Sequence, residues 1–444
     1  MELRCDVVVL GAGAAGLAAA RVLSQAGASA VVLEARERVG GRIYTREDVG
    51  LPVPIDLGGE FIHGATEVSF ALLRSAGTVA VDTQEGAFAF EDGELRERGD
   101  PFAAVEQVMK RARELSDDVS IEEFLRSLPD DLADVERVRG YVRMMVEGFD
   151  AADPRRASTR ALAEEWGDSK NGQTSEQFRP LGGYAPLLRT LLGDLDPAHI
   201  HVRLATPVHA VKRATAADGD PDRVIAEATT CTGDALTVRA RAAIVTLPVG
   251  VLQANGVRFE PELPERTRGA LERIVMGPVI KLVLRFRTAF WERVQGGRYR
   301  DGAFFSNRDG GFPVFWTLLP LRTPMLVAWA GGPRAAALAG SDEGRLVDRA
   351  LSDLKVLFGE EADPHAELEA AYAHDWDRDP YACGAYSYVS VGEGDPRGDL
   401  AAPVDGVLFF AGEATSPIAE AGTVAGALLT GERAAREALA AHPA

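Results

Sequence analysis

Apolar runs, separated by a glycine turn and an alanine-rich stretch, open the chain. Residues 5–10 are rich in valine and predict a buried strand, and residues 11–16 form a glycine turn that leads into an alanine-rich helix. Residues 31–33 predict a second strand, which ends on Glu34. The order strand, glycine turn, helix, strand and acid is typical of a βαβ unit that binds a dinucleotide.

Each glycine of this turn has its own role in such a unit. Gly11 permits the tight turn, Gly13 lets the backbone approach a pyrophosphate at the helix N-terminus, and Gly16 lets helix and strand pack closely. Glu34 follows Gly16 by eighteen residues, where a carboxylate can accept hydrogen bonds from an adenosine ribose. A glycine turn alone is a weak signal, so the prediction of a dinucleotide-binding unit depends on the strands on both sides of the turn.

A second glycine cluster narrows the choice of cofactor. Gly41 and Arg42 follow the second strand, and the guanidinium of Arg42 is a fork of donors that suits a pyrophosphate. The alternative is a solvated arginine in a loop. Glu34 combined with this Gly-Gly-Arg sequence resembles FAD enzymes rather than NAD dehydrogenases.

Similar patterns recur in the middle and at the end of the chain. Residues 202–212 alternate like a strand, residues 223–241 predict paired strands, residues 242–248 and 407–411 predict buried strands, and residues 422–439 predict a helix. Since both chain ends carry such patterns, we predict an α/β fold with a Rossmann-like FAD-binding domain built from residues 1–66, 198–270 and 395–444.

The segments between these parts must then loop out into an α+β substrate-binding domain, made of residues 67–197 and 271–394. The first segment is mostly helical in pattern, with helices predicted over residues 101–115 and 121–128. The second predicts strands over residues 279–286 and 312–319 and a helix over residues 343–358.

Composition bears on the partners. The 444 residues carry a formal charge of −19, which disfavours nucleic acids and anionic membranes because both need basic patches. Such a charge would attract cationic small molecules, although solubility alone is the simpler interpretation. Cys5, Cys231 and Cys383 are too few and too scattered for a disulfide framework or a metal cluster, so no metal is predicted.

The chain also lacks the patterns of export and membrane insertion. No basic segment followed by an apolar stretch precedes the first strand, which gives no sign of a signal peptide. No run approaches the ~18 apolar residues that a membrane span requires. We therefore predict a cytoplasmic protein.

Ordered motifs along nearly the whole chain resemble those of the flavin-dependent amine oxidases. This family includes polyamine oxidases, monoamine oxidases and flavin-dependent histone lysine demethylases. Besides the N-terminal pattern, the matching stretches are residues 56–64 (DLGGEFIHG), 181–184 (LGGY), 244–252 (IVTLPVGVL), 276–286 (MGPVIKLVLRF), 376–389 and 408–413 (LFFAGE). The resemblance implies an FAD domain interleaved with a substrate domain, a small-molecule amine as substrate and O2 as electron acceptor.

The residue most specific to this resemblance is Lys281, which stands inside an apolar stretch. In the family the lysine at this place holds a water against the flavin N5, and its charge can assist electron transfer to oxygen. The alternative is a surface lysine that reaches out to solvent. The resemblance also places Trp376 on the flavin and Tyr386 towards the substrate, whereas ordinary core aromatics are the alternative.

Two departures from the monoamine oxidases bear on the site. Ala385 stands where those enzymes carry the cysteine that links the flavin, and Cys383 lies two residues away, so we predict that FAD is bound non-covalently. Thr423 stands at the place of their second cage tyrosine. The aromatic cage is therefore half built, as in the demethylase and polyamine branches, and Thr423 is expected to face the substrate.

His63 resembles the active-site histidine of polyamine oxidases, which monoamine oxidases and histone demethylases lack. A neutral imidazole there can accept a hydrogen bond from a substrate amine. The alternative is a buried histidine bonded to the backbone. Glu164 and Glu165 are candidates for binding a distal ammonium, but a solvated helix face is the favoured interpretation.

The remaining residues that the resemblance singles out are expected to contact FAD. Glu413 is expected near the ribityl chain, and the backbone of Thr423 and Val424 near the pyrimidine ring of the flavin. The other expected contacts are Ala15, Arg36, Gly58, Gly59, Glu60, Phe61, Val208 and Gly412.

We therefore predict an FAD-dependent amine oxidase that oxidises a primary or secondary amine, with polyamines among the candidates. Hydride transfer to flavin N5 would give an imine, then an aldehyde with an amine or ammonia, and oxygen would be reduced to hydrogen peroxide. One rival is an L-amino-acid oxidase of the same fold, which would carry a Met-Arg pair in place of Glu60 and Phe61. Another is a non-catalytic escort protein, which Glu34, Arg42 and Glu413 disfavour. The patterns specify neither the amine nor an oligomeric state.

Overall fold

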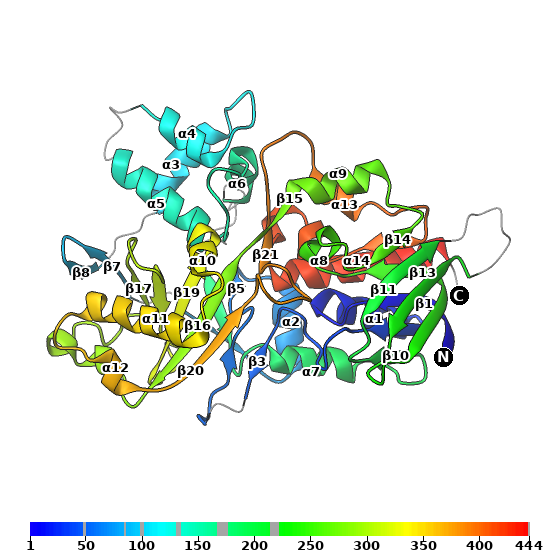
Figure 1. Cartoon of the computed structure of the whole chain (residues 1–444), viewed down its shortest axis with the longest axis horizontal. Helices are drawn as coiled ribbons and strands as arrows, with labels where there is room; N and C mark the ends of the chain where they lie inside the picture. Colours follow the sequence, from blue (N-terminus) through cyan, green and yellow to red (C-terminus); the bar gives the residue numbers. More distant parts are fainter. Residues whose placement is uncertain are drawn as a thin grey trace.

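The structure, a computed structural model, describes residues 1–47, 50–83, 86–97, 102–129, 135–166, 176–213 and 222–442. Two large β-sheets occupy the two halves of the molecule in Figure 1, and a helical lobe lies above one of them. Both termini lie at the outer side of the half that holds the first sheet.

The first sheet contains the predicted βαβ unit. Its strand order is β10-β2-β1-β13-β12-β11-β14, and β22 pairs with β13. The strands are β1 (Glu2–Leu10), β2 (Ala30–Leu33), β10 (Ile200–Arg203), β11 (Val208–Arg213), β12 (Val224–Thr229), β13 (Ala235–Val245), β14 (Arg258–Glu260) and β22 (Leu408–Phe410). β1 runs parallel to β2 and β13, with Leu10 opposite Leu33 and Val245, so three carboxyl ends meet at one edge. Ligands of such sheets bind outside that edge.

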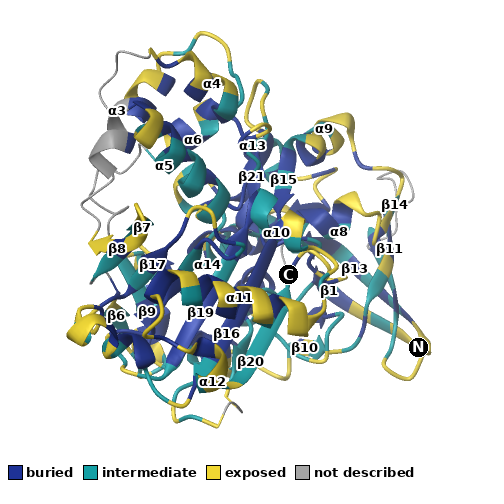
Figure 2. Ribbon diagram, turned by 60° about the vertical axis from the view of Figure 1, so that its left-hand side comes forward, coloured by how far each residue is buried: buried dark blue, intermediate teal, exposed yellow. Residues whose placement is uncertain are grey.

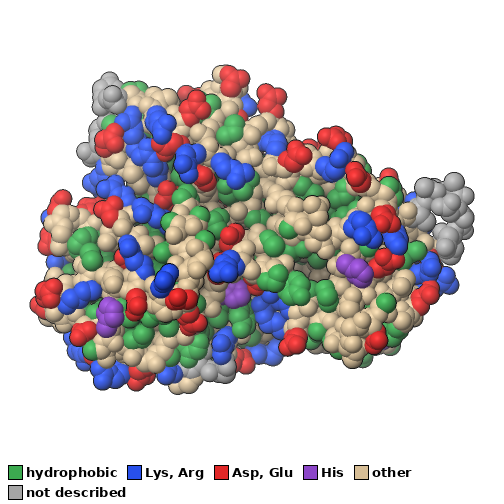
Figure 3. Space-filling view, viewed as in Figure 1, with side chains coloured by type: hydrophobic (Ala, Val, Ile, Leu, Met, Phe, Trp, Pro, Cys, Tyr) green, Lys and Arg blue, Asp and Glu red, His purple; other side chains and the backbone are tan. Residues whose placement is uncertain are grey.

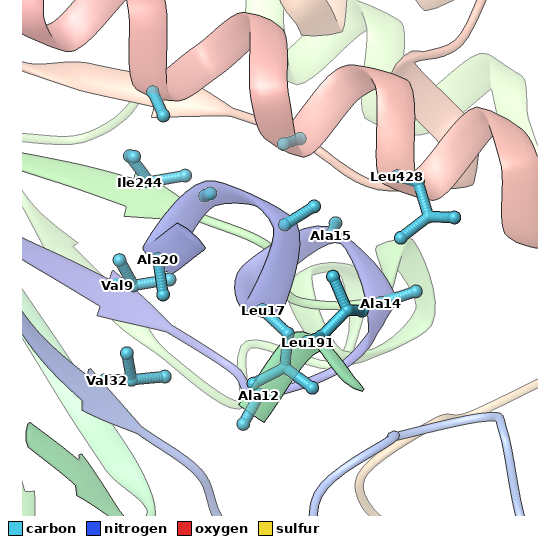
Figure 4. Packing of buried hydrophobic residues seen from close by; sticks show 14 of the residues in the cluster. Val9, Ala12, Ala14, Ala15, Leu17, Ala20, Val32, Leu191, Ile244 and Leu428 are labelled. Carbon is cyan, nitrogen blue, oxygen red and sulfur yellow. The ribbon is translucent and has the colours of Figure 1, made fainter. Parts of the chain in front are cut away.

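Small side chains let two helices pack closely on this sheet. α1 (Ala14–Gln25) and α14 (Val424–Ala441) are rich in alanine, and a Cβ at Gly431 would lie 2.1 Å from the carbonyl oxygen of Ala15. Figure 4 shows α1 between the strands that carry Val9 and Ile244 and the helix α14, which contributes Leu428. The packing fixes the N-terminus of α1 at the carboxyl edge of the sheet.

Two further helices join this core. α2 (Glu67–Ser75) packs against α14, and α7 (Ala185–Gly193) packs against α1. Both helices lie inside residues 67–197, which the sequence pattern assigns to the substrate-binding domain. A division based on packing would place them with the nucleotide-binding part, and the interleaving of the other segments remains our proposal.

The second sheet has the order β20-β16-β19-β18-β17-β7-β8. Its strands are β7 (Ala87–Glu91), β8 (Glu94–Glu97), β16 (Val279–Phe286), β17 (Phe304–Ser306), β18 (Val314–Trp316), β19 (Met325–Gly331) and β20 (Leu368–Asp375), with helices α10 (Gly332–Leu338), α11 (Glu343–Phe358) and α12 (Pro364–Glu367) nearby. An apolar core joins the sheet to the inner side of α11, whose outer side is exposed in Figure 2. β16 and α11 have the bounds that the pattern predicts, whereas the strand predicted over residues 312–319 is shorter.

The helical lobe consists of α3 (Phe102–Ala112), α4 (Ile121–Ser127), α5 (Val135–Gly148) and α6 (Thr159–Glu165). The hydroxyls of Ser120 and Ser158 cap α4 and α6 by accepting bonds from first-turn N–H groups, which explains where these two helices begin. The indole of Trp329 in β19 donates to the carbonyl of Gly148 over 2.8 Å and so ties the lobe to the second sheet.

Small sheets lie between the two large ones in Figure 1. They pair β15 (Ile274–Gly277) with β21 (Tyr386–Val389), β5 (Ile62–His63) and β6 (Ala80–Asp82) with β9 (Gln177–Pro180), and β3 (Thr45–Arg46) with β4 (Ile55–Asp56). The other elements are α8 (Val249–Gln253), α9 (Glu265–Arg273), α13 (Pro396–Ala401) and short 3-10 turns at Phe290–Glu292, Val294–Gly297, Glu413–Thr415 and Ile418–Glu420. Two of these small sheets carry predicted site residues.

One strand prediction is wrong. Residues 202–212 belong to two strands, β10 and β11, which lie far apart in the first sheet. Ala205 has a positive φ of 47°, and Pro207 has no N–H to donate to a neighbouring strand, so the chain turns between them.

Acidic and basic side chains are interspersed over the face shown in Figure 3. Among the described residues, no helix combines the length and hydropathy needed to cross a bilayer.

Candidate active site

The turn between β1 and α1 is built for an anion. Gly11 has a φ of +103°, and a Cβ there would lie 2.7 Å from the hydroxyl of Thr246, while a Cβ at Gly16 would lie 1.9 Å from the carbonyl oxygen of Gly11. The N-cap of α1 is Gly13, which offers no side-chain acceptor, and the first turn holds no acid. The first-turn N–H groups of α1 therefore have no side-chain cap, and a phosphate suits them.

Glu34 joins the turn to the end of β2. Its carboxylate accepts hydrogen bonds from the N–H of Ala12 over 2.8 Å and from the N–H of Arg36 over 2.9 Å. An ionised carboxylate has about four acceptor positions, so acceptor capacity remains for a ribose hydroxyl. Thr206, just before Val208, donates its N–H to the carbonyl of Glu34 over 2.7 Å and so places Val208 beside this edge.

Arg36 serves the packing of the chain. Its guanidinium makes two bonds to Asp379, of 2.7 and 2.9 Å, and lies over the ring of Tyr381. The ring of His374 bonds to the same carboxylate over 3.0 Å. Burial opposes the charge of Asp379, but His374 and Arg36 hold the pKa of this carboxyl well below its usual range. The side chain of Arg36 thus anchors the segment that follows Trp376.

Arg42 and Glu413 meet across the sheet edge. Their side chains pair over 2.8 Å, and the hydroxyl of Ser387 donates to the other carboxylate oxygen over 2.6 Å. Although burial opposes its charge, Arg42 and Arg397 lower the pKa of Glu413, so the carboxylate is ionised. Gly412 has a φ of +130°, and a Cβ there would meet no atom within 4 Å. Open space therefore lies beside this pair.

These observations test whether FAD, the cofactor that the sequence implies, fits the chain. The free first turn of α1 suits the pyrophosphate, Glu34 suits the ribose, and the space beside Gly412 lies next to donors and acceptors that suit a polyol chain. A Cβ at Gly41 would lie 3.4 Å from the Cα of Gly13, which brings Arg42, the next residue along the chain, close to the turn before α1. The residues present fit the group.

Lys281 is a buried ammonium rather than a surface lysine. Its side chain is 1% exposed. Nζ donates to the carboxylate of Glu60 over 2.6 Å and to the carbonyl of Gly58 over 3.1 Å. The other oxygen of Glu60 accepts from Arg179 over 2.8 Å and from the indole of Trp316 over 3.0 Å. Because protein donors occupy the carboxylate of Glu60, a contact with FAD would have to come from its backbone.

The same loop meets Trp376 and the start of α14. The indole of Trp376 donates to the carbonyl of Leu57 over 2.9 Å, and a Cβ at Gly58 would lie 3.1 Å from its ring. A Cβ at Gly59 would lie 3.5 Å from the side chain of Val424. Thr423 caps α14, since its hydroxyl accepts from the N–H of Gly426 over 3.0 Å. The hydroxyl of Thr423 is therefore engaged within the fold.

Four rings, which we call the aromatic wall, join His63 to Tyr386. The hydroxyl of Tyr386 donates to the carbonyl of Phe149 over 2.6 Å, and its ring stacks on Trp329 with centroids 6.5 Å apart. The rings of His63 and Phe149 meet edge to face at 5.1 Å. Both residues are exposed at the surface of the site, but the protein atoms packed around His63 displace water from its surroundings, and this desolvation lowers the pKa of His63 to about 4. His63 is therefore neutral at ordinary pH.

Two carboxyl groups, Asp150 and Glu165, stand close to Tyr386. Burial raises the pKa of Glu165 to about 7 and raises that of Asp150 well above its ordinary value, and Glu165 adds to the shift of Asp150. Oδ2 of Asp150 is buried without a hydrogen-bond partner among the described residues. Both groups also raise the pKa of the Tyr386 phenol, after burial itself.

The preferred interpretation of Glu164 and Glu165 as a solvated face therefore holds for one residue only. Glu164 is exposed, whereas Glu165 is partly buried, close enough to Tyr386 to raise the pKa of its phenol, because the two neighbours lie on different sides of α6. Cys383 is partly exposed, and its thiol contacts the carbonyl of Pro380. Ala385, at the place of the linking cysteine, bonds through its carbonyl to Arg42 over 2.8 Å.

Several residues in these contacts carry no motif of their own. They are Asp150, Phe149, Arg179, Trp316 and Trp329. Arg179 follows a glutamine and a phenylalanine in a short strand, and nothing in that pattern distinguishes it from a surface arginine. The tryptophans stand among apolar residues in β18 and β19, which predicts core residues and does not indicate that Trp316 would donate to a carboxylate.

Known proteins are similar to this chain over most of its length. The sequence model described as flavin containing amine oxidoreductase matches residues 14–439. Polyamine oxidase 3 of Oryza sativa subsp. japonica is 30% identical over 469 residues, which cover 97% of this chain and 88% of that protein. Lysine-specific histone demethylase 1 homolog 3 of Arabidopsis thaliana is 29% identical, and this chain spans 29% of its length.

Solved structures show the same fold. Cyclohexylamine oxidase from Brevibacterium oxydans IH-35A has a TM-score of 0.80 at 22% identity, with 98% of each chain covered. Putrescine oxidase bound to putrescine has a TM-score of 0.79 at 21% identity, covering 99% of this chain and all of the other. The family resemblance and the predicted fold class are confirmed.

Proposed function

The chain belongs to the family of flavin containing amine oxidoreductases, and from this premise we propose that it oxidises a small diamine or polyamine. As a member of that family it is an oxidoreductase that acts on amine donors with FAD as cofactor. The finer parts of the proposal are non-covalent binding of FAD, release of hydrogen peroxide and the class of amine. Each is supported by named residues.

The convergence of distant residues around Gly58 carries the proposal. Lys281 donates to the Gly58 carbonyl, the ring of Trp376 borders its Cα, and Gly59 touches Val424 at the start of α14. The chemistry that bound FAD would supply is hydride acceptance from the carbon beside the amine nitrogen and return of the electrons to O2, with an imine and hydrogen peroxide as products. The protein must hold the amine, keep it neutral and provide charge where oxygen is reduced.

His63 suits the first of these tasks. With a pKa of about 4 its imidazole is uncharged, so one ring nitrogen is free to accept a hydrogen bond from an amine N–H. A protonated histidine would instead repel an ammonium and could not accept that bond. Phe149 packs edge to face on the ring and limits its motion. His63 can therefore orient a free amine without supplying a proton.

Tyr386 and Trp329 suit the positioning of the carbon chain. Their rings are nearly parallel, with an interplanar angle of 17°, and the hydroxyl of Tyr386 is held by the Phe149 carbonyl. A fixed aromatic surface confines an alkyl chain at little cost in conformational entropy, and a cation near its face gains about 0.5–1 kcal/mol.

Asp150 and Glu165 suit a second amino group. An ammonium held between them would supply the partner that Oδ2 of Asp150 lacks and would offset the cost of two buried carboxyls. The names of polyamine oxidase relatives and of the putrescine complex agree with a substrate that has two amines. A monoamine would leave Oδ2 of Asp150 without a partner.

Both rival functions are less consistent with the site. An L-amino-acid oxidase needs a cation for the substrate carboxylate, whereas Asp150 and Glu165 would repel that group. Arg179 cannot serve, since its donors are occupied by Glu60 and by the carbonyls of Thr317 and Leu319. An escort protein without flavin would need neither the open space beside Gly412 nor a buried ammonium.

A peroxide-coupled screen of monoamines, diamines, polyamines and L-amino acids tests the proposal. We expect diamines or polyamines to have the highest kcat/KM. Because the pKa of Glu165 is about 7 and that of Asp150 is raised well above its ordinary value, the ratio of diamine to monoamine kcat/KM should rise through about pH 7, by about tenfold for one partly screened charge pair. Asp150→Asn should flatten that rise, and Glu164→Gln, on the exposed side of α6, is the matched control. Rapid turnover of a common L-amino acid would refute the proposal.

A further inference from the structure

Glu60 lies at the centre of a buried group of three charged side chains and one tryptophan, which come from four parts of the fold. It precedes β5, Lys281 comes from β16, Arg179 from β9 and Trp316 from β18. Glu60 and Arg179 are each 6% exposed in their side chains, and Lys281 is 1% exposed. Every bond of the carboxylate is directed to one of these three donors, so Glu60 is the shared partner of two cations.

Arg179 is held in place by its other hydrogen bonds and cannot move towards Lys281. One of its terminal nitrogens donates to the carbonyl of Leu319 over 3.0 Å and the other to that of Thr317 over 3.2 Å. Its Nε and the indole of Trp316 share one oxygen of Glu60, which leaves the second oxygen for Lys281. The carboxylate is thus aimed at the lysine by two fixed donors.

Two other titratable groups surround Lys281. Asp56, in β4, accepts a bond from the hydroxyl of Thr45, and burial raises its pKa to about 7. A cavity of about 20 Å³, enough for one water, is lined by Asp56, Glu60 and Arg179. His374, opposite Lys281 in β20, is engaged by Asp379. Asp56 therefore changes charge near neutrality, whereas Glu60 is held ionised by Lys281 and Arg179 against the effect of burial.

We propose that Glu60 is a positioning residue that keeps the Lys281 ammonium charged and aimed at the Gly58 carbonyl. The inference rests on the proposed function, in which that charge assists the reduction of oxygen. An amine buried without an anionic partner tends to lose its proton, since a low-dielectric interior disfavours the charged form. Glu60 offsets that tendency, while the total charge of Lys281, Arg179 and Glu60 stays positive.

A purely structural role of Glu60 predicts a different set of effects. Glu60 joins β9, β16 and β18, so its loss should lower Tm under either hypothesis. Only the positioning role also changes how the oxygen reaction depends on pH. Glu60→Gln is the sharpest variant, because the amide keeps the shape and one acceptor oxygen but removes the charge.

The first test follows the reoxidation of FAD in the holoenzyme by stopped flow between about pH 6 and 10. The flavin is reduced with dithionite, so the test does not require an amine substrate. In Glu60→Gln we expect the rate to be near native at low pH and to decline with rising pH at least about one pH unit earlier than in the native enzyme. Asp56→Asn removes the neighbouring carboxyl that changes charge near pH 7, so its effect should be confined to the region around pH 7 and should leave the decline at high pH where it is in the native enzyme.

The second test measures how fast the ammonium protons of Lys281 exchange with water in the FAD-bound protein. The chain has only five lysines, so 15N labelling of lysine gives few side-chain signals, and Lys281→Met identifies the one of interest. Lys212 is an internal control, because its Nζ lies 2.6 Å from Glu227, the same distance as in the Lys281 pair, but it is 37% exposed. We expect the protons of Lys281 to exchange with water at least about tenfold more slowly than those of Lys212, and about tenfold faster in Glu60→Gln than in the native protein.

The outcomes separate the hypotheses. Superimposable pH profiles of native protein and Glu60→Gln, even with a lower Tm, would overturn the inference and leave Glu60 a structural residue. If Glu60→Gln does not fold, equal exchange at Lys281 and Lys212 in the native protein would overturn it as well. If no amine is oxidised but both results appear as expected, the function proposed above fails while the pairing of Glu60 with Lys281 stands.

Discussion

Replacement of Lys281 by methionine should separate the two half-reactions of the enzyme. Methionine keeps the length and apolar stem of the side chain while it removes the charge. The side-chain bonds of Lys281 go to Glu60 and to the Gly58 carbonyl, so none of them holds a residue of the aromatic wall, and the backbone pairing of Lys281 with Trp329 is kept by methionine. Reduction of the flavin by amine should therefore proceed at close to the native rate, whereas reoxidation by oxygen should slow.

The size of the effect follows from the buried charges. Lys281 and Arg179 against Glu60 leave one positive charge, and removal of Lys281 leaves none. Two unit charges about 4 Å apart attract by about 4 kcal/mol at an effective dielectric of about 20. Because Glu60 offsets part of that field, we expect a loss of roughly 1.4–2.7 kcal/mol, which is about a tenfold to hundredfold slower reoxidation.

Stability should fall for a separate reason. Oε2 of Glu60 has no donor other than Lys281 among the described residues, and an unsatisfied buried acceptor costs about 1–3 kcal/mol. Arg179 still neutralises the carboxylate, so the larger cost of a lone buried charge does not apply. The double variant Lys281→Met with Glu60→Gln should recover part of this loss of stability but none of the oxygen reactivity.

Stopped-flow mixing of reduced enzyme with oxygenated buffer measures the rate directly, and anaerobic mixing with amine measures the other half-reaction. Lys212→Met removes a lysine whose partner, Glu227, lies on the exposed side of the first sheet, so it should change neither rate. Native reoxidation in Lys281→Met would refute the reasoning, because it would show that the buried charge does not act on oxygen.

Three further predictions concern FAD, His63 and the charge of the substrate. With Ala385 at the linking place, acid precipitation should release all flavin into the supernatant, and flavin retained in the pellet would contradict non-covalent binding. His63→Ala should slow flavin reduction and weaken amine binding by about tenfold with unchanged FAD content, and a lower Tm with native reduction kinetics would favour a structural histidine. Anaerobic reduction at limiting amine should speed up between about pH 7 and 9, because an alkylamine with a pKa near 10 is more often neutral there; a flat profile would contradict the need for a free amine.

The cradle for the dinucleotide could be predicted because its causes are local. Gly11 and Gly16 are required by contacts within a single strand-turn-helix unit, and Glu34 ends the next strand, so their spacing in the sequence reflects their spacing in the fold. The bounds of β16 and α11 could also be predicted from the sequence, since a continuous apolar pattern sets those of β16 and an amphipathic pattern sets those of α11. The wrong strand over residues 202–212 also had a local cause, the turn at Ala205 and Pro207.

Charge pairing across the chain could not be predicted in this way. Glu60 and Lys281 are 221 residues apart, and the Tyr386 hydroxyl bonds to a carbonyl 237 residues away. Whether a glutamate faces FAD, a lysine or solvent depends on which side of a short element it occupies. Neighbouring Glu164 and Glu165 show this, since one is exposed and the other is partly buried close to Tyr386.

The distribution of charge in the site gives a physical reason for these long-range pairs. A negative net charge of the whole protein attracts cationic amines, but oxygen reduction needs a local positive charge, and the two demands conflict unless they are separated in space. In this fold the carboxyls Asp150 and Glu165, whose pKa values burial raises, stand beside Tyr386, while Lys281 and Arg179 outweigh Glu60 beside Gly58. His63 is neutral and so disturbs neither field. Under the proposed function, a second, cationic amino group would therefore be bound at one end of the site and a nascent anion stabilised at the other.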